Sequence, residues 1–112
     1  MKILVTGNLG YIGSTLVSQL VKTQNFKVTG LDLGFYVDSQ VSPNVRIHQI
    51  YKDIRDITEA DLQGFEVVVH LAAISNDPLG ELAEASTYEI NEMAAIRIFE
   101  LAKKVGVGQL IF

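Results

Sequence analysis

The sequence predicts an α/β fold, a doubly wound parallel sheet with the strand order 3-2-1-4-5. Short apolar segments alternate along the chain with segments of helical periodicity, which is typical of parallel strands joined by right-handed crossovers. A glycine-rich turn, Gly7-x-x-Gly10-x-x-Gly13, follows the first apolar segment and opens the first helical one. The run Val67–Val69 is continuously apolar, as expected of a strand that is buried on both faces. In such a sheet the ligand crevice lies where the strand order reverses, between strands 1 and 4.

The first part of the chain predicts a strand, a tight turn and a helix. Lys2–Thr6 is short and rich in β-branched residues, and Gly7 ends it. The helix is predicted over Tyr11–Lys22, and its apolar stripe at helical spacing consists of Ile12, Leu16, Val17, Leu20 and Val21. We expect that a side chain at Gly13 would push this helix off the strand, and that Asn25 caps the helix end in a left-handed conformation.

Two further strands and a short helix are predicted in the middle of the chain. Phe26–Leu33 is the second strand, and a polar loop over 34–44 follows it. The alternation of apolar and polar residues in Val45–Ile50 predicts a third strand at an edge of the sheet. Thr58–Leu62 predicts a weak helix with Thr58 as its N-cap, and Gly64 ends it.

The last third of the chain predicts a strand, a long helix and the start of another strand. The fourth strand is Glu66–Leu71, and a loop over 74–80 follows. A capping box, Ser86-x-x-Glu89, predicts that the long helix starts after Ser86 and runs to Lys104. Its buried stripe is expected to consist of Ile90, Ala94, Ile98, Leu101 and Val105, and Gly106 should end it. The fifth strand, Gln109–Phe112, is the last element of the predicted sheet.

Composition narrows the class of protein. The 112 residues suit one domain, and a net charge of −4 argues against a nucleic-acid partner. The chain has no cysteine, and His48 and His70 share no ligand spacing, so we expect no metal site. The N-terminus lacks the apolar core of a signal peptide, and the run Val67–Ile74 is too short to span a bilayer. We therefore expect a cytoplasmic protein without a membrane partner.

The glycine turn can bind a phosphate through its main chain. The first turn of a helix carries N–H groups without partners, and the helix dipole adds partial positive charge there. Residues 7–14 contain no Lys or Arg, so an anion at this turn must be held mainly by the backbone. The glycine triplet by itself is equally compatible with a simple tight turn.

A carboxylate stands where a dinucleotide site needs one. Asp32 follows Gly13 by 19 residues and ends the second strand, where it can accept both ribose hydroxyls and would repel a 2′-phosphate. No Lys or Arg follows before Arg46. This pattern favours NAD over NADP. The alternative is an aspartate that caps a loop.

Two other segments end predicted strands. The carboxylate and backbone of Asp53-Ile54-Arg55-Asp56 can bind the edge of adenine, although a solvated turn with a local ion pair is the better interpretation of this segment alone. In His70-Leu71-Ala72-Ala73, the small residues let the backbone pass close to a flat ligand. We interpret His70 as a packed or backbone-bonded histidine rather than a base, because it ends a buried strand.

Together these motifs resemble the extended short-chain dehydrogenase/reductases and, more narrowly, the NAD-dependent epimerase/dehydratase family. The resemblance covers essentially all 112 residues and includes Asn91 in the long helix. It implies a Rossmann-type fold, NAD as the cofactor, a nucleotide-sugar substrate for the full-length protein, and a structural role for Asn91 beneath the active site. The residues implied to bind NAD are Gly7, Gly10, Tyr11, Ile12, Gly13, Asp32, Asp53, Ile54, Leu71, Ala72 and Ala73. Residues 75–80 would lie near the substrate, and the resemblance allows a homodimer.

The catalytic pair of that family, Tyr-x-x-x-Lys, has no counterpart in this sequence. The residues four positions after the tyrosines are Thr15, Gln40, Arg55 and Glu92. We therefore assign no catalytic residue and expect residues 1–112 to be the N-terminal NAD-binding portion of such a protein, without its C-terminal substrate-binding part and inactive alone. The alternatives are a non-catalytic NAD(P)-binding sensor and a fragment that cannot hold its fold. An open sheet edge after the last strand would favour self-association.

Overall fold

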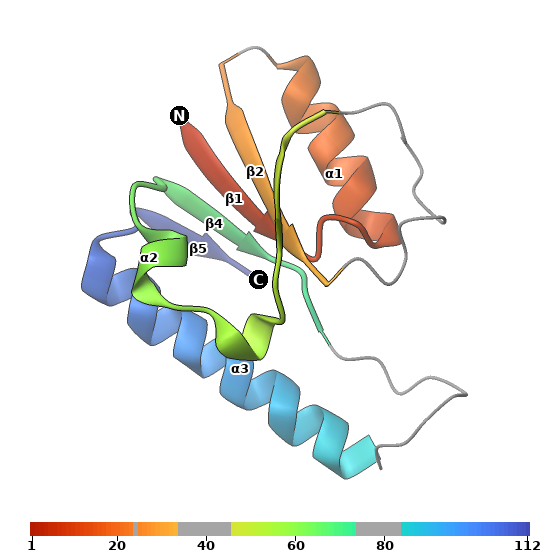
Figure 1. Ribbon diagram of the computed structural model, residues 1–112, viewed down its shortest axis with the longest axis vertical. Coiled ribbons are helices and arrows are strands. Elements are labelled where there is room, and N and C mark those ends of the chain that lie inside the picture. The colour runs from red at the N-terminus through yellow and green to blue at the C-terminus, as the bar shows by residue number, and fades with distance from the viewer. Residues whose placement is uncertain (24, 34–45, 74–83) are drawn as a thin grey trace.

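The computed structural model describes residues 1–23, 25–33, 46–73 and 84–112. A five-stranded parallel sheet in the order β3-β2-β1-β4-β5 forms its centre (Figure 1). The strands are β1 (Lys2–Thr6), β2 (Lys27–Asp32), β3 (His48–Tyr51), β4 (Val67–His70) and β5 (Gln109–Ile111). The helices are α1 (Tyr11–Lys22), α2 (Glu59–Leu62) and α3 (Glu84–Val105), and a short 3-10 helix, η2, covers Ile54–Asp56. The predicted fold class and strand order are confirmed.

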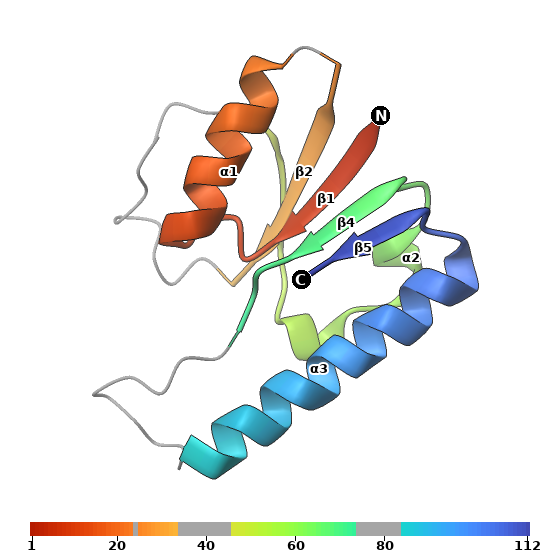
Figure 2. The ribbon, with the colours of Figure 1, turned by 180° about the vertical axis from the view of Figure 1, so that it is seen from behind.

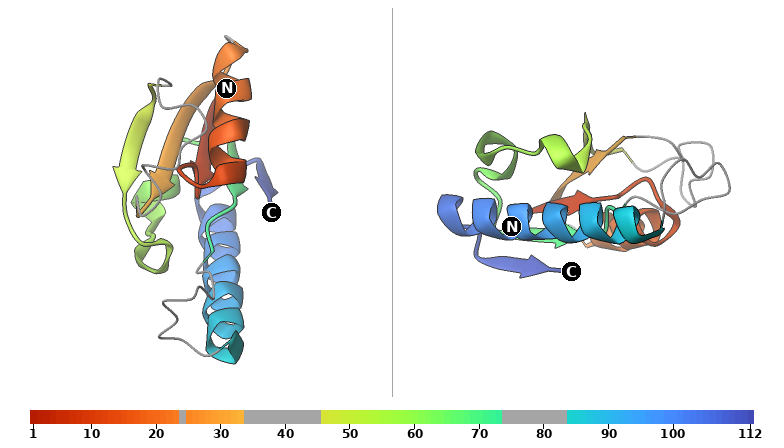
Figure 3. Two further views of the ribbon diagram at one scale, coloured as in Figure 1. Left: turned by 90° about the vertical axis from the view of Figure 1, so that its right-hand side faces the viewer. Right: turned by 90° about the horizontal axis from the view of Figure 1, so that it is seen from below.

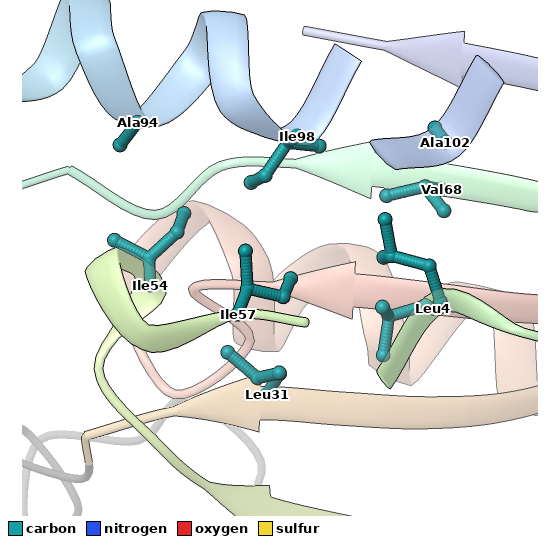
Figure 4. Packing of buried hydrophobic residues seen from close by; sticks show 9 residues of the cluster. Leu4, Leu31, Ile54, Ile57, Val68, Ala94, Ile98 and Ala102 are labelled. Atoms are coloured by element: carbon teal, nitrogen blue, oxygen red, sulfur yellow. The ribbon is translucent and has the colours of Figure 1, made fainter. Parts of the chain in front are cut away.

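Helices cover both faces of the sheet, as the doubly wound fold requires. Figures 1 and 2 show α1 on one side of the strands and α2 and α3 on the other. Side chains on successive strand residues point to opposite faces, so Ile3 and Val5 pack with Val17 of α1, while Leu4 packs with Ile98 of α3. Figure 4 shows the second cluster, in which Ile54 and Ile57 lie between the strands and α3.

The register aligns the carboxyl ends of three neighbouring strands. Thr6 pairs with Leu31 on one side and with His70 on the other. The carboxyl ends of β1, β2 and β4 therefore lie together at one edge of the sheet. The strand order reverses between β1 and β4, because the chain crosses from β1 to β2 on one side and reaches β4 on the other. The N-terminal half of α3 extends past this edge (Figure 3).

The predicted stripe of α1 is wrong at both of its ends. Val17 is buried, and Leu16 and Leu20 are partly buried against the sheet. In contrast, 70% of Ile12 is exposed, because the first turn of α1 follows the glycine turn beyond the carboxyl edge. Val21, in the last turn, is 38% exposed. Asn25 does not cap this helix: its C-cap is Thr23 in an extended conformation, and the N–H of Thr23 donates to the carbonyl of Leu20 at 3.1 Å.

The other boundaries agree with expectation, with two shifts. Helix α3 begins at Glu84, two residues before the predicted cap Ser86; Glu84 and Ala85 are good helix formers and extend the helix backwards. Strand β3 is displaced toward Tyr51, which pairs with Asp32. The predicted first residue of this strand, Val45, lies outside the described residues, as do the predicted loops over 34–44 and 74–80. The remaining predictions for the helices are confirmed. Thr58 and Asp61 form a capping box at α2, and Gly64 follows the end of this helix with a φ of +88°. Gly106 follows the end of α3 with a φ of +81°, and Ala94 and Ile98 of its predicted stripe are buried.

Candidate functional site

The glycine turn is packed against backbone on two sides. Gly7 has a φ of +73°, and a Cβ there would lie 2.6 Å from the N of Ala72. A Cβ on Gly13 would lie 2.1 Å from the carbonyl oxygen of Gly7 and 2.8 Å from the Cα of Asn8. The expected close approach at Gly13 is therefore present, but its partner is the turn itself and not the preceding strand. At Gly10 a Cβ would meet only the Gly7 oxygen, at 3.5 Å.

The turn leads directly into the start of α1. The N–H of Gly10 donates to the carbonyl of Gly7 at 3.2 Å, and the N–H of Ser14 donates to Gly10 at 2.9 Å. Gly10 is the N-cap, no side chain caps this end, and the first turn contains no acidic residue. The amides of Tyr11, Ile12 and Gly13 precede the first intrahelical hydrogen bond and have no acceptor within the helix. This helix end carries partial positive charge, so it can hold a phosphate group.

Asp32 lies beside the glycine turn and caps it, which is the alternative that its position allowed. Its Oδ2 accepts the N–H of Leu9 at 3.0 Å, so the carboxylate does cap a loop, and that loop is the glycine turn. The turn is also tied to β2 by the N–H of Gly7, which donates to the carbonyl of Leu31 at 2.8 Å. Asp32 is half-buried. A negative charge is therefore fixed beside the turn, at the end of the strand next to β1.

The segment after β3 reaches the same edge. The N–H of Lys52 donates to the carbonyl of Asp32 at 3.1 Å. Asp53 forms an ion pair with Arg55 at 2.7 Å and also accepts the N–H of Arg55, as in the alternative interpretation of this segment. The side-chain hydrogen bond with Arg55 is the main reason why the pKa of Asp53 lies below its usual range. The side chain of Ile54 is buried in the core beneath α3, so only its main chain can face a ligand.

His70 is a packed histidine, as expected, and it is bonded to a side chain. Its Nδ1 lies 2.7 Å from the hydroxyl oxygen of Thr6, and its ring meets Phe112 edge-on at 5.7 Å. The Thr6 hydroxyl also accepts the N–H groups of Leu71 and Ala72, each at 3.2 Å. The N–H of Leu71 donates to the main-chain carbonyl of Thr6 as well, at 3.0 Å, so both the hydroxyl and the carbonyl of Thr6 hold the segment after β4 against the end of β1. Burial lowers the pKa of His70 to about 4.

Thr6 connects the glycine turn to the segment that follows β4, and the sequence analysis assigned it no role. Through its hydroxyl it holds Leu71 and Ala72 beside β1, and Ala72 in turn lies against Gly7. The only signal was a polar residue at the end of a fully buried strand. A second pair without a predicted role is Asn8 with Gln49, whose side-chain amides bond each other across β2.

The other predicted features lie elsewhere or beyond the described residues. Asn91 is half-buried in α3, and residues 75–80 are not described. Within the ranges that the structure describes, no three His, Asp or Glu residues gather as a metal would require. Of the helices in the described part of the chain, none has both the length and the apolar character of a membrane span.

The chain is similar in sequence to proteins of one family. The model of the NAD dependent epimerase/dehydratase family matches residues 3–112. A UDP-glucose 4-epimerase of Cyamopsis tetragonoloba is 30% identical, over 97% of this chain and 34% of that protein. The dTDP-glucose 4,6-dehydratase of Salmonella typhimurium is also 30% identical, over 93% of this chain and 31% of that protein. The chain thus spans about a third of the length of these curated relatives.

Solved structures show the same likeness. The UDP-glucuronic acid 4-epimerase from Bacillus cereus in complex with NAD superimposes with a TM-score of 0.77 at 31% identity, over 98% of this chain and 38% of that one. The UDP-N-acetylglucosamine 4-epimerase from Methanobrevibacter ruminantium in complex with UDP-N-acetylmuramic acid superimposes with a TM-score of 0.80 at 31% identity. This match covers 99% of this chain and 36% of that one.

Proposed function

This chain belongs to the NAD-dependent epimerase/dehydratase family, and on that premise we propose that it is the NAD-binding portion of a nucleotide-sugar epimerase or dehydratase. The observation that carries the proposal is the pairing of an uncapped helix start with a fixed carboxylate. The first amides of α1 and the carboxylate of Asp32 lie on either side of one turn, Gly7–Gly10.

The pyrophosphate is bound by main-chain groups. We place it at the start of α1, where the N–H groups of Tyr11 and Ile12 point out of the helix and both residues are largely exposed. Gly10 leaves the backbone accessible there, while Gly7 and Gly13 let the turn pack directly against Ala72 and the start of α1. A basic side chain is not required, because the helix end supplies the positive potential.

Asp32 selects the cofactor. A carboxylate at the end of β2 accepts hydrogen bonds from the adenosine ribose, and its charge repels a 2′-phosphate. The bond from Leu9 to Oδ2 holds this carboxylate against the turn, so it cannot easily rotate away from a larger ligand. The site is therefore proposed to bind NAD more tightly than NADP.

The remaining NAD contacts come from the neighbouring strand ends. Asp53 and Ile54 are proposed to contact adenine through main-chain groups and through the lone pairs of Asp53 that Arg55 leaves available. Leu71, Ala72 and Ala73 are proposed to line the cofactor toward its nicotinamide. When bound, NAD supplies the hydride chemistry of the family's reaction, and the 112 residues contain no Tyr-x-x-x-Lys pair to exchange the substrate's proton.

Titration calorimetry with NAD and NADP on the intact protein that carries this chain tests the proposal. We expect NAD to bind more tightly, and we expect Asp32→Asn, which keeps the oxygen but loses the charge, to reduce this preference. Glu100→Gln on the exposed face of α3 removes an equal charge far from the turn and should preserve it. Tighter binding of NADP by the unaltered protein, or no binding of either nucleotide, would refute the proposal.

A further inference from the structure

We propose that Asn8 and Gln49 form a positioning pair that sets how strongly this site prefers NAD over NADP. The inference rests on the proposed function, because it concerns the carboxylate that selects the cofactor. Neither residue was singled out by the sequence motifs. Asn8 is the residue after Gly7 in the glycine turn, and Gln49 lies on the edge strand β3.

The two amides bond each other reciprocally. The Nδ2 of Asn8 donates to the Oε1 of Gln49 at 2.6 Å, and the Nε2 of Gln49 donates to the Oδ1 of Asn8 at 3.0 Å. The same Nε2 also lies 3.2 Å from the carbonyl oxygen of Ile50. Asn8 is only 3% exposed, so losing its partner would leave a buried amide without hydrogen bonds, which is costly. This pair therefore ties the glycine turn firmly to β3.

The bond must cross β2, and a glycine makes this crossing feasible. Gly30 of β2 is in register with Val5 of β1 and with Gln49 of β3. A Cβ on Gly30 would lie 2.2 to 2.5 Å from the amide atoms of Asn8. The Asn8 side chain thus occupies the space that any other residue at position 30 would fill.

The amide pair acts on the cofactor site through the next residue of the turn. Leu9 follows Asn8 directly, and its N–H donates to the Oδ2 of Asp32 at 3.0 Å. Because side chains alternate along a strand, Gly30 and Asp32 face the same side of β2. The amide pair fixes the peptide that directs the Leu9 N–H toward the carboxylate. Without the pair, both the turn and Asp32 gain freedom, and a 2′-phosphate meets a less rigid negative charge.

The ratio of the dissociation constants for NADP and NAD distinguishes positioning from simple stability. We compare the intact protein with Gln49→Leu, which removes the amide at similar size, and with Gly30→Ala, which displaces Asn8 and leaves Gln49 in place. The ratio should fall about tenfold in both variants, the effect of weakening one hydrogen bond to a charged group. The control is Ile98→Val, a core variant that destabilises the fold away from the turn, and its ratio should not change. A parallel rise of both constants with an unchanged ratio in the two variants would overturn the inference.

A second measurement needs no cofactor. The Leu9 amide should exchange with solvent at least about tenfold faster in Gln49→Leu than in the unaltered protein, because its hydrogen bond is a charge-assisted one. Unchanged exchange at Leu9 would contradict the positioning role even if nucleotide binding failed for other reasons. Conversely, an unaltered protein that binds neither nucleotide refutes the proposed function, while the exchange rate still reports whether the pair orders the turn.

Discussion

Replacing Gly13 with alanine tests whether the start of α1 depends on direct backbone contact with the glycine turn. The added Cβ would lie 2.1 Å from the carbonyl oxygen of Gly7, whereas ordinary contact begins at 3.4 Å, so the two atoms must separate by 1.3 Å. Backbone atoms of Gly7 and Asn8 form the obstacle, so no side chain can rotate to relieve it.

The expected cost follows from two opposing effects. Overpacking a dense site destabilises a fold by about 1–3 kcal/mol, and here the upper part of that range applies because backbone must move. Alanine in a helix offsets up to about 1 kcal/mol of this through its higher helix propensity. We therefore expect Gly13→Ala to lower the free energy of unfolding by about 1–2 kcal/mol. A shift of this size in the turn should also weaken NAD binding by about tenfold or more, since positioning errors near 1 Å are costly in a preorganised site.

Gly10→Ala is the matched control within the same motif. Its Cβ would lie 3.5 Å from the Gly7 oxygen, and its φ of −75° suits any residue, so the expected loss of stability is below about 1 kcal/mol, the difference between glycine and alanine at an N-cap. Urea denaturation of the intact protein and both variants measures the two values. If Gly13→Ala were as stable as Gly10→Ala, the contact between α1 and the turn would not constrain the fold as the geometry requires.

Two further predictions concern the bonds between β1 and β4. Burial lowers the pKa of His70 in the folded protein to about 4, from an ordinary value of 6.5. As the pH falls below 6.5, the histidine therefore takes up a proton in the unfolded chain but not in the folded protein. The contribution of the neutral ring to the free energy of unfolding is complete above pH 6.5 and is lost progressively toward pH 4. Between pH 7 and pH 5, the free energy of unfolding should fall by up to about 2 kcal/mol more in the unaltered protein than in His70→Asn, whose side chain can still form a hydrogen bond with Thr6 but does not titrate. Equal pH dependence of the two proteins would contradict the buried, neutral ring. Thr6→Val removes the hydroxyl that accepts the N–H of Ala72, and denaturation should show a loss of about 1–3 kcal/mol for the unsatisfied groups. Thr6→Ser keeps the hydroxyl and should retain most of this stability, so a serine variant as weak as the valine variant would disprove the role of the hydroxyl.

The class of fold could be predicted from the sequence because its signals are local. Apolar strands that alternate with amphipathic helices indicate a parallel sheet, and each of these elements can be recognised from residues close together in the sequence. The spacing of the glycines likewise indicates the turn after β1. The same is true of helix ends, where Gly64 and Gly106 adopt positive φ values. Ile12 shows the limit of such reasoning: its helical spacing matched the buried stripe, yet it is 70% exposed because periodicity does not reveal where the sheet ends beneath a helix.

By itself, the sequence determined the order of the elements, the glycine turn and the acidic residue that follows it at the end of β2. Only the tertiary structure decided which side chains hold that turn in place. Thr6 meets His70 across 64 residues, and Asn8 meets Gln49 across 41. Periodicity specifies which face a side chain points to but not which residue it will meet, since that depends on strand register. Parallel pairing of β1 with β4, and of β3 with β2 beneath the Asn8 side chain, brings these residues together.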